Sequence, residues 1–180
     1  MDEMAKASEQ IIDEILVIDC QAGRAQALEA LVSRWNKPFW RHARRLVGNG
    51  DIAWDITQQS WLAIIKGIKR LREPAHFRAW AYRIVTSKAM DWIRKSQRRR
   101  NTDREAFHHH QSVAIEDSGV RELLEKLDLK KKIVLSLYYF EQLSVTEIGI
   151  ALKIPKGTVR SRLHNARKEL KDLWRTYIDE

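Results

Sequence analysis

The residues best suited to chemistry in this sequence are polar side chains spaced along residues 156 to 174. At about 100° per residue, as in an α-helix, this segment has one apolar side. That side consists of Val159, Leu163, Ala166, Leu170 and Leu173. Hydrogen-bonding side chains occupy the opposite side and its flank, namely Arg160, Ser161, His164, Asn165 and Lys168. Arg and Asn can form paired hydrogen bonds with base edges, so the pattern favours contact with nucleic acid, with an ordinary solvated helix as the alternative.

A short helix and a turn precede these residues. Ser144 followed by Glu147 has the pattern of a capping box, which predicts a helix over residues 145 to 153. Pro155 then interrupts the helical pattern. Helix, turn and helix together are typical of a DNA-binding motif whose second helix presents its N-terminal residues to the major groove. The agreement of the three features favours DNA recognition over a merely solvated surface.

Charge is distributed unevenly along the chain. The formal net charge is +9, although the first twenty residues contain six acidic residues and one Lys. The remaining, strongly basic body favours a polyanionic partner, either nucleic acid or an anionic membrane surface. No apolar run approaches the roughly 20 residues that cross a bilayer, which argues against membrane insertion. The single Cys20 and an acidic rather than signal-like start predict a cytoplasmic protein.

The first half of the chain is expected to be a helical bundle. Hydrophobic residues make up 44% of the sequence, and seven Gly and three Pro are too few for many short strands. Pro38 is predicted to kink the chain or to start a new first turn. Asp51 is predicted to cap a helix over residues 52 to 71. Apolar residues on several sides of that helix, Trp54 and Ile65 among them, indicate a position packed by several neighbours.

A further helix is expected after a loop at residues 72 to 76. Its predicted buried side carries Phe77, Ala81, Ile84, Val85, Ala89 and Trp92, and its other side carries Tyr82, Arg83, Thr86 and Met90. Six of the seven Trp residues lie before residue 93, which predicts an aromatic core with Trp80 as the exception. Residues 83 to 104 contain eight Lys or Arg and two Asp, the composition of a segment that binds a polyanion.

The helical pattern stops after residue 97 and resumes near Val120. The intervening residues have the composition of a flexible basic linker, and the adjacent His108, His109 and His110 lack the spaced partners of a metal site. We therefore predict an all-α protein with two small helical domains. The predicted boundaries are an N-terminal helical bundle at 1–97, a linker at 98–119 and a C-terminal helix-turn-helix domain at 120–180.

Two blocks of this sequence resemble a known family. The stretch SVTEIGIALKIPKGTVRSRLHNARKEL is similar to the C-terminal DNA-binding region of the extracytoplasmic-function (ECF) group of sigma-70 factors. The stretches RLVGNGDIAWDITQQSWLAIIKGIKRL and HFRAWAYRIVTSKAMDWIRK are similar to the N-terminal region of the same group. This resemblance implies a bacterial transcription initiation factor that is not an enzyme, carries no cofactor or metal, and binds core RNA polymerase and promoter DNA. An anti-sigma factor is a further candidate partner.

The resemblance also implies roles for individual residues. The polymerase clamp would contact Asp55, Gln58 and Gln59. The minus-ten element would be bound by three neighbouring parts of the chain: a loop that captures a flipped base, the positions that border this loop, and the basic helix that follows. The residues concerned are Leu71, Arg72, His76, Trp80, Tyr82, Arg83, Ser87, Lys88, Arg94 and Lys95. The minus-thirty-five element would be read by Lys156, Thr158, Arg160, Ser161, His164, Asn165 and Lys168.

Five positions depart from residues that are common in the family. Ser87 replaces a frequent Asn and bears on the choice of minus-ten base, and Asn165 replaces a frequent Arg and bears on the minus-thirty-five sequence. Gln142, Asp128 and Gly149 replace a common Gly, Pro and Ala and are expected to affect turns and packing.

Two other functions are alternatives to this interpretation. A stand-alone helix-turn-helix regulator would need a sensor domain, and a nuclease would need clustered carboxylates or spaced metal ligands, which the scattered acids do not provide.

Overall fold

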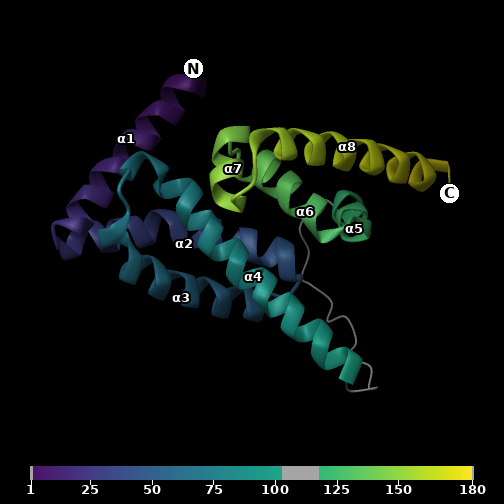
Figure 1. The fold of residues 1–180 in the computed structure, drawn as a ribbon, viewed down its shortest axis with the longest axis horizontal. Helices are drawn as coiled ribbons and strands as arrows, with labels where there is room; N and C mark the ends of the chain where they lie inside the picture. The colour runs from purple at the N-terminus through teal and green to yellow at the C-terminus, as the bar shows by residue number, and fades with distance from the viewer. Residues whose placement is uncertain (1, 103–117, 180) are drawn as a thin grey trace.

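Regular structure in the computed structural model is helical throughout the residues that it describes, 2–102 and 118–179. The elements are α1 (Asp2–Gln21), α2 (Ala25–Val47), α3 (Gly50–Gly67), η1 (Ile68–Arg70), η2 (Pro74–His76), α4 (Phe77–Thr102), α5 (Ser118–Lys126), α6 (Leu129–Leu135), η3 (Ser136–Phe140), α7 (Val145–Leu152) and α8 (Lys156–Asp179). Helices α1 to α4 form one group, and α5 to α8 form a second group that lies against α4 and α2 (Figure 1). The predicted all-α architecture with two helical regions is confirmed. Helix α4 extends to Thr102, so the first residues of the predicted linker are helical.

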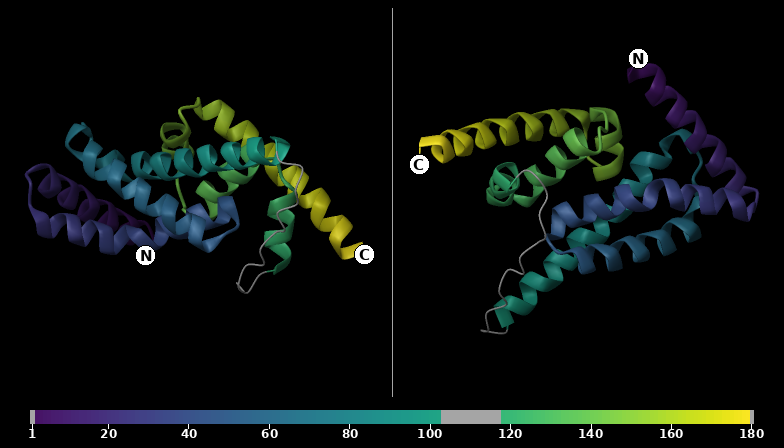
Figure 2. Two further views of the ribbon diagram at one scale, coloured as in Figure 1. Left: turned by 90° about the horizontal axis from the view of Figure 1, so that it is seen from below. Right: turned by 180° about the vertical axis from the view of Figure 1, so that it is seen from behind.

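Aromatic side chains form the centre of the first group. The ring of Phe39 lies 5.5 Å from that of Trp35, 5.4 Å from that of Trp61 and 5.3 Å from that of Tyr82. These rings come from α2, α3 and α4, which run alongside one another when the molecule is seen from below and from behind (Figure 2). Because large aromatic side chains bury much apolar area and prefer tilted contacts, this cluster stabilises the bundle.

The start of α3 differs from the prediction by two residues. Asn49, rather than Asp51, caps the helix, and its side-chain oxygen accepts a hydrogen bond from the Ile52 N–H at 3.0 Å. Gly48 ends α2 with a left-handed φ of 75°, a backbone geometry that favours glycine. The tight turn between α2 and α3 therefore leaves Asp51 exposed in the first turn of the helix, where its carboxylate suits the helix dipole.

Pro38 does not start a new helix, so of the two outcomes predicted from the sequence the fresh first turn is wrong. Helix α2 continues from Ala25 to Val47 with Pro38 inside it. A proline in a helix interior removes one backbone hydrogen bond and costs about 3 kcal/mol. Trp35 and Phe39, on both sides of it, are buried in the aromatic cluster. Their packing outweighs the local cost.

Helix α4 is covered on two sides, whereas the sequence pattern predicted one. Tyr82 and Thr86, assigned to the exposed side, are 1% and 2% exposed. The reason is tertiary: the Thr86 hydroxyl forms a hydrogen bond with the His42 imidazole of α2 at 2.8 Å. The Tyr82 ring packs on Phe39 of α2, and the Tyr82 hydroxyl donates to Glu141 of the second group. Phe77, Val85 and Ala89 on the other side are buried as predicted.

The second group has a smaller core made by its own helices. Ile133, Leu137, Ile148, Val159 and Leu163 are all buried there. Asp128 caps α6 by accepting a hydrogen bond from the Lys130 N–H, which gives a physical role to a residue that replaces a common Pro. The free ends of α1 and α8 project away from both groups (Figures 1 and 2).

Candidate nucleic-acid interface

The helix-turn-helix predicted from the sequence is present in α7 and α8. The Ser144 Oγ accepts a hydrogen bond from the Glu147 N–H at 3.2 Å, and the Glu147 carboxylate accepts one from the Ser144 N–H at 2.8 Å. This capping box fixes the start of α7. A Cβ at Gly149 would lie 3.1 Å from the Ile154 carbonyl oxygen, so glycine allows a close approach in the turn. The motif therefore has a rigid, locally determined geometry.

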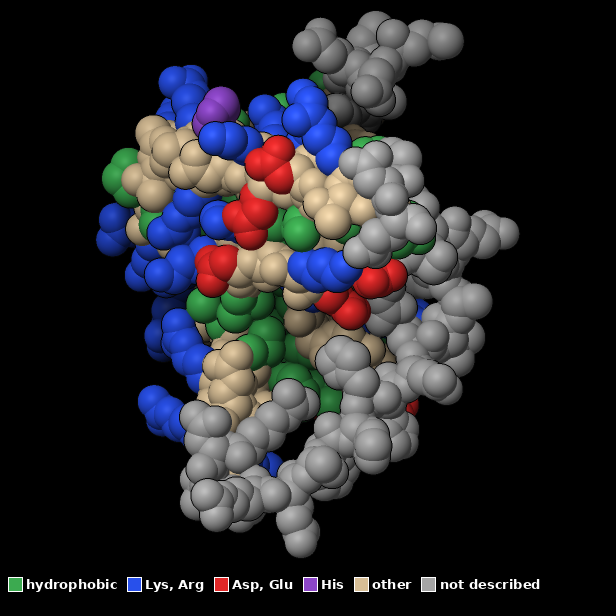
Figure 3. Space-filling view, turned by 90° about the vertical axis from the view of Figure 1, so that its right-hand side faces the viewer, with side chains coloured by type: hydrophobic (Ala, Val, Ile, Leu, Met, Phe, Trp, Pro, Cys, Tyr) green, Lys and Arg blue, Asp and Glu red, His purple; other side chains and the backbone are tan. Residues whose placement is uncertain are grey.

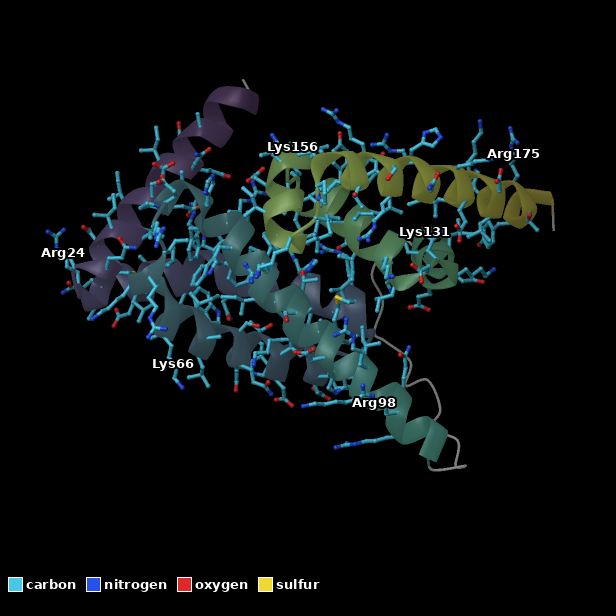
Figure 4. The ribbon with its side chains drawn as sticks, in the orientation of Figure 1. Arg24, Lys66, Arg98, Lys131, Lys156 and Arg175 are labelled. Carbon is cyan, nitrogen blue, oxygen red and sulfur yellow. The ribbon has the colours of Figure 1, made fainter. Side chains whose placement is uncertain are left out.

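The N-terminal half of α8 presents a polar face to solvent. Val159, Leu163 and Ala166 are buried against the domain, as the apolar stripe predicted. The exposed side chains include Lys156, Arg160, Ser161, His164, Asn165 and Lys168, while Thr158 is half-buried. Figure 4 shows Lys156 at the start of this helix and Arg175 toward its other end. Because the donors occupy successive turns on one side, they can meet a single groove of DNA.

The segment joining α3 to α4 forms a second exposed structure. Arg72 and His76 are exposed, and Leu71 is half-buried. Trp80 is not free, because its indole packs on the backbone of Gly67, where an added Cβ would lie 2.9 Å from the ring atom Cζ2. The sequence pattern did not reveal a further contact, in which the Gln21 side chain donates hydrogen bonds to two carbonyls of this segment.

Helix α4 continues this surface with basic side chains. Arg83 and Lys88 are half-buried, whereas Ser87, Lys95 and Arg94 are exposed. Arg94 also lies 3.7 Å from the carboxylate of Asp91, a surface ion pair of little energetic weight. In the space-filling view of the face at the end of α8, Lys and Arg side chains gather along the left edge and the top (Figure 3).

The outer side of α3 is a third exposed surface. Asp55, Gln58 and Gln59 are all exposed, as expected for partner contacts. Three large apolar side chains lie among them, namely Trp54, Leu62 and Ile65 at 45%, 61% and 42% exposure. Trp54 and Ile65 were predicted to pack within the bundle, and this was wrong because no described helix covers that side of α3. The spacing of 54, 58, 62 and 65 along one helix side could have revealed the surface.

A buried carboxylate connects the two helical groups. Glu141, in the turn before α7, accepts hydrogen bonds from the Arg45 guanidinium and from the Tyr82 hydroxyl, and its carbonyl accepts one from Arg78. The imidazole of His42 lies 3.6 Å from the same carboxylate. Four side chains of the first group thus surround one residue of the second. Tyr82, one of the residues expected to border the minus-ten pocket, is therefore buried in this arrangement.

The protonation states of the Glu141 carboxyl group and the Tyr82 hydroxyl group are set by burial and by the neighbouring charges. Burial by itself raises the pKa of Glu141, but the neighbouring His42, Arg45 and Tyr82 together hold it below its usual value. Burial, followed by the Glu141 charge, raises the pKa of Tyr82 well above its usual value. The carboxylate is thus ionised and the phenol is neutral near neutral pH, the state in which the phenol donates and the carboxylate accepts.

Two family models match this chain. "Sigma-70 region 2" matches residues 31–99, which hold most of α2 and α4 and all of α3. "Sigma-70, region 4" matches residues 119–170, which hold nearly all of α5, all of α6 and α7, and most of α8. The chain belongs to the sigma-70 family. As a sigma factor it binds core RNA polymerase and promoter DNA, directs transcription initiation and is not an enzyme.

Relatives place this sigma factor in the ECF group. It is 29% identical to the ECF RNA polymerase sigma factor SigW of Bacillus subtilis over 84% of this chain and 92% of the relative. Identity to SigV of the same organism is 28%, over 78% of this chain and 87% of the relative. The ECF RNA polymerase sigma-E factor of Escherichia coli strain K12 is 26% identical over 91% of this chain and 94% of the relative. These matches favour a sigma factor over the stand-alone regulator.

Solved structures share the fold. A structure of CnrH in complex with the cytosolic domain of CnrY superposes with a TM-score of 0.71 at 23% identity, covering 92% of this chain and 98% of that one. RpoE in complex with the anti-sigma factor NepR, from Bartonella quintana, gives a TM-score of 0.72 at 17% identity, covering 82% and 96%.

Two other kinds of site have no candidate within the described residues. No group of three or more His, Cys, Asp or Glu residues there could hold a metal ion, and the sequence motif His108 to His110 lies outside them. No described helix is long and apolar enough to cross a membrane.

Proposed function

We propose that the sigma factor divides its work between two domains, 1–97 and 120–180, joined by residues 98–119. In this proposal α8 reads the minus-thirty-five element through Lys156, Thr158, Arg160, Ser161, His164, Asn165 and Lys168. The observation that carries it is the exposed row of donors on the first turns of α8, behind a capped α7. Arg160 and Asn165 are the residues suited to base edges, and Lys168 suits a phosphate.

The first domain, in the same proposal, binds and opens the minus-ten element. The loop of Leu71, Arg72 and His76 captures an unstacked base, and a basic path along α4 holds the single strand. The path and the loop border consist of Trp80, Tyr82, Arg83, Ser87, Lys88, Arg94 and Lys95. Exposed Arg and Lys side chains on one long helix support the second role, because single-stranded DNA is held largely through its phosphates.

Core polymerase docks on the outer side of α3 in this proposal. Asp55, Gln58 and Gln59 supply the polar contacts, and Trp54, Leu62 and Ile65 supply the apolar centre. The support is the composition of that side, in which large exposed apolar side chains lie among polar ones, as at the centres of protein interfaces.

Both domains can read one promoter only after they separate. The minus-ten and minus-thirty-five elements are separated by about 25 base pairs, which corresponds to about 85 Å along the duplex. In the structure α7 lies directly against α4. We therefore propose that the contact around Glu141 opens when polymerase and promoter are bound.

Two further assignments belong to this proposal. The protein acts in the cytoplasm, where it meets polymerase and promoter DNA. An anti-sigma factor is a partner. This role is supported by the anti-sigma factor NepR in the RpoE structure and by a row of exposed side chains on α1, namely Ile11, Ile15 and Ile18.

The experiment that tests this function compares the protein alone with its polymerase complex. We expect the purified protein to bind duplex promoter DNA weakly and to form a stable open complex once core polymerase is added. Open complexes are detected by permanganate reactivity of unpaired thymines. Tight and sequence-specific binding without polymerase, together with no recruitment of polymerase, would contradict the proposal.

A further inference from the structure

Gln21, the last residue of α1, reaches the segment proposed to capture a base. Its side-chain amide nitrogen donates one hydrogen bond to the Ile68 carbonyl at 2.9 Å and one to the Leu71 carbonyl at 2.8 Å. Both protons of the amide are thereby used on backbone acceptors 47 and 50 residues away in the chain. The residue lies outside the segment matched by the region 2 model, which begins at residue 31.

These two carbonyls lie where the chain needs donors. Helix α3 ends at Gly67 and passes into the single 3₁₀ turn Ile68–Arg70. The last carbonyls of a helix have no partner within it and must find other donors. Leu71 donates its own N–H to the Ile68 carbonyl at 3.1 Å, which closes the turn. The Gln21 amide adds a second donor to the Ile68 carbonyl and supplies a donor to the Leu71 carbonyl. Gln21 thus acts as a C-terminal cap supplied by another helix.

The amide is held in place by the docking of α1. Val17 and Cys20, on the same helix, are buried against the bundle. Nearer its middle, the Asp13 carboxylate accepts hydrogen bonds from the Trp35 indole at 2.9 Å and from Arg34 at 2.8 Å. A fixed helix gives the Gln21 side chain little freedom, so the two carbonyls are held in one geometry.

The far end of the segment is anchored separately. Phe77 is fully buried at the start of α4, and the Trp80 indole packs on Gly67. Between these anchors Arg72 and His76 are exposed and able to meet DNA. A loop held at both ends loses less conformational entropy when it binds.

We propose that Gln21 is a positioning residue for base capture, which it serves by fixing the start of the segment 68–76. The inference rests on the proposed function of that segment. Gln21 does not touch DNA. Without it, the Leu71 carbonyl loses the Gln21 donor and the Ile68 carbonyl keeps only the Leu71 N–H, so the segment samples other conformations and discriminates less between bases.

The test measures base discrimination by the assembled holoenzyme. Single-stranded minus-ten oligonucleotides, with each of the four bases placed in turn at each position, are bound to core polymerase carrying the wild-type or variant sigma factor. Single strands are used so that duplex melting does not contribute. For Gln21→Leu we expect a loss of preference on the order of tenfold at the captured position, with polymerase affinity and duplex minus-thirty-five binding unchanged.

Two more variants make the test specific. Gln21→Glu keeps the shape but places a carboxylate against two carbonyls, so its loss should equal or exceed that of Gln21→Leu. Gln10→Leu is the matched control, because this glutamine lies on the same helix, donates to Glu14 at 2.9 Å in an exposed contact and should leave discrimination unchanged.

A merely structural role would give a different pattern. It would lower the melting temperature and the active fraction of Gln21→Leu, while the folded molecules kept full preference between bases, and this result would overturn the inference. The double variant Arg72→Ala with His76→Ala tests the segment itself. If that variant keeps its preference, the proposed function of the segment fails; if it loses preference while Gln21→Leu does not, only the positioning role fails.

Discussion

At the residue scale, the side chains at the start of α8 differ in the contact each can make. An Arg can form two hydrogen bonds with one guanine, whereas a Lys interacts with phosphate as a point charge. Arg160 lies in the first turns of the helix, and Lys168 lies further along the same exposed side. Substitution of Arg160 should therefore affect mainly the choice of DNA sequence, and substitution of Lys168 mainly the affinity for DNA.

Arg160→Ala is expected to reduce discrimination at one or two positions of the minus-thirty-five element by about 1–3 kcal/mol. Lys168→Ala, its matched control, should weaken binding equally on all sequences and lower the salt slope by about one. Open-complex formation on a library of minus-thirty-five sequences at two salt concentrations measures both effects. Equal losses on every sequence for Arg160→Ala would show that Arg160 holds phosphate instead.

Gln142 occupies a backbone geometry that favours glycine. Its φ is 51°, in the left-handed region, directly after Glu141 and before α7. Gln142→Gly should raise the free energy of unfolding by about 0.5–1 kcal/mol, because glycine is not strained there although it gains entropy when unfolded. Chemical denaturation measures the change. Gln142→Ala keeps the strain, so a gain of equal size in that variant would contradict the explanation.

At the scale of the element, α3 has one side in the bundle and one side exposed. Ala53, Ile56 and Ile64 are buried, while the opposite side alternates polar and large apolar residues. The two sides can be altered independently, because substitutions on the exposed side leave the aromatic core intact. This property allows a direct test of polymerase binding.

The double variant Asp55→Arg with Gln58→Ala is expected to weaken binding to core polymerase by tenfold or more, about 1.4 kcal/mol, because interface contacts near the centre of a patch carry most of the energy. Helical content and melting temperature should change little. Glu29→Arg, a charge reversal on the exposed side of α2, is the control and should bind normally. If the double variant melts early yet binds polymerase with normal affinity, its residues serve the fold.

At the scale of the whole molecule, the contact around Glu141 decides how the two helical groups sit together. Removing its charge leaves the Arg45 guanidinium without its carboxylate partner, whereas Arg78 keeps its acceptor, the Glu141 backbone carbonyl, and burial makes the loss costly. Hydrogen bonds to charged groups contribute about 1.5–3 kcal/mol each. One carboxylate can therefore control the balance between the packed and separated arrangements.

Glu141→Gln is expected to separate the two groups in the free protein. Dyes attached through Lys66→Cys and Arg175→Cys, both exposed positions (Figure 4), report the change as a loss of energy transfer. Glu122→Gln, whose carboxylate meets only Lys126 at the surface, is the control. Unchanged energy transfer in Glu141→Gln would show that apolar packing alone holds the groups together.

The same contact should respond to acid. The pKa of Glu141 is lower in the folded protein than its usual value of 4.5, so its stabilising contribution is complete above about that pH. The contribution is lost as the pH falls through the lower, folded-state value. Energy transfer in the wild type should therefore fall in this acidic range, and Glu141→Gln should lack this step.

The sequence by itself determined the features that depend on neighbouring residues. Spacing placed Val159, Leu163 and Ala166 on one side of α8 and the donors on the other, and Ser144 with Glu147 identified the start of α7. These features follow from helical periodicity and local hydrogen bonds, which require no distant partner. The helix-turn-helix and its reading face were for that reason predictable.

Only the tertiary structure decided which sides of the helices are covered by other helices and which remain exposed. Periodicity shows that residues share a side, but it does not show what covers that side. Tyr82 is buried because its ring packs on α2 and its hydroxyl meets Glu141 of the second group, and Trp54 is exposed because no described helix covers that side of α3. Gln21 became a candidate only when folding brought it to Ile68 and Leu71, because a contact across about fifty residues leaves no periodic trace in the sequence.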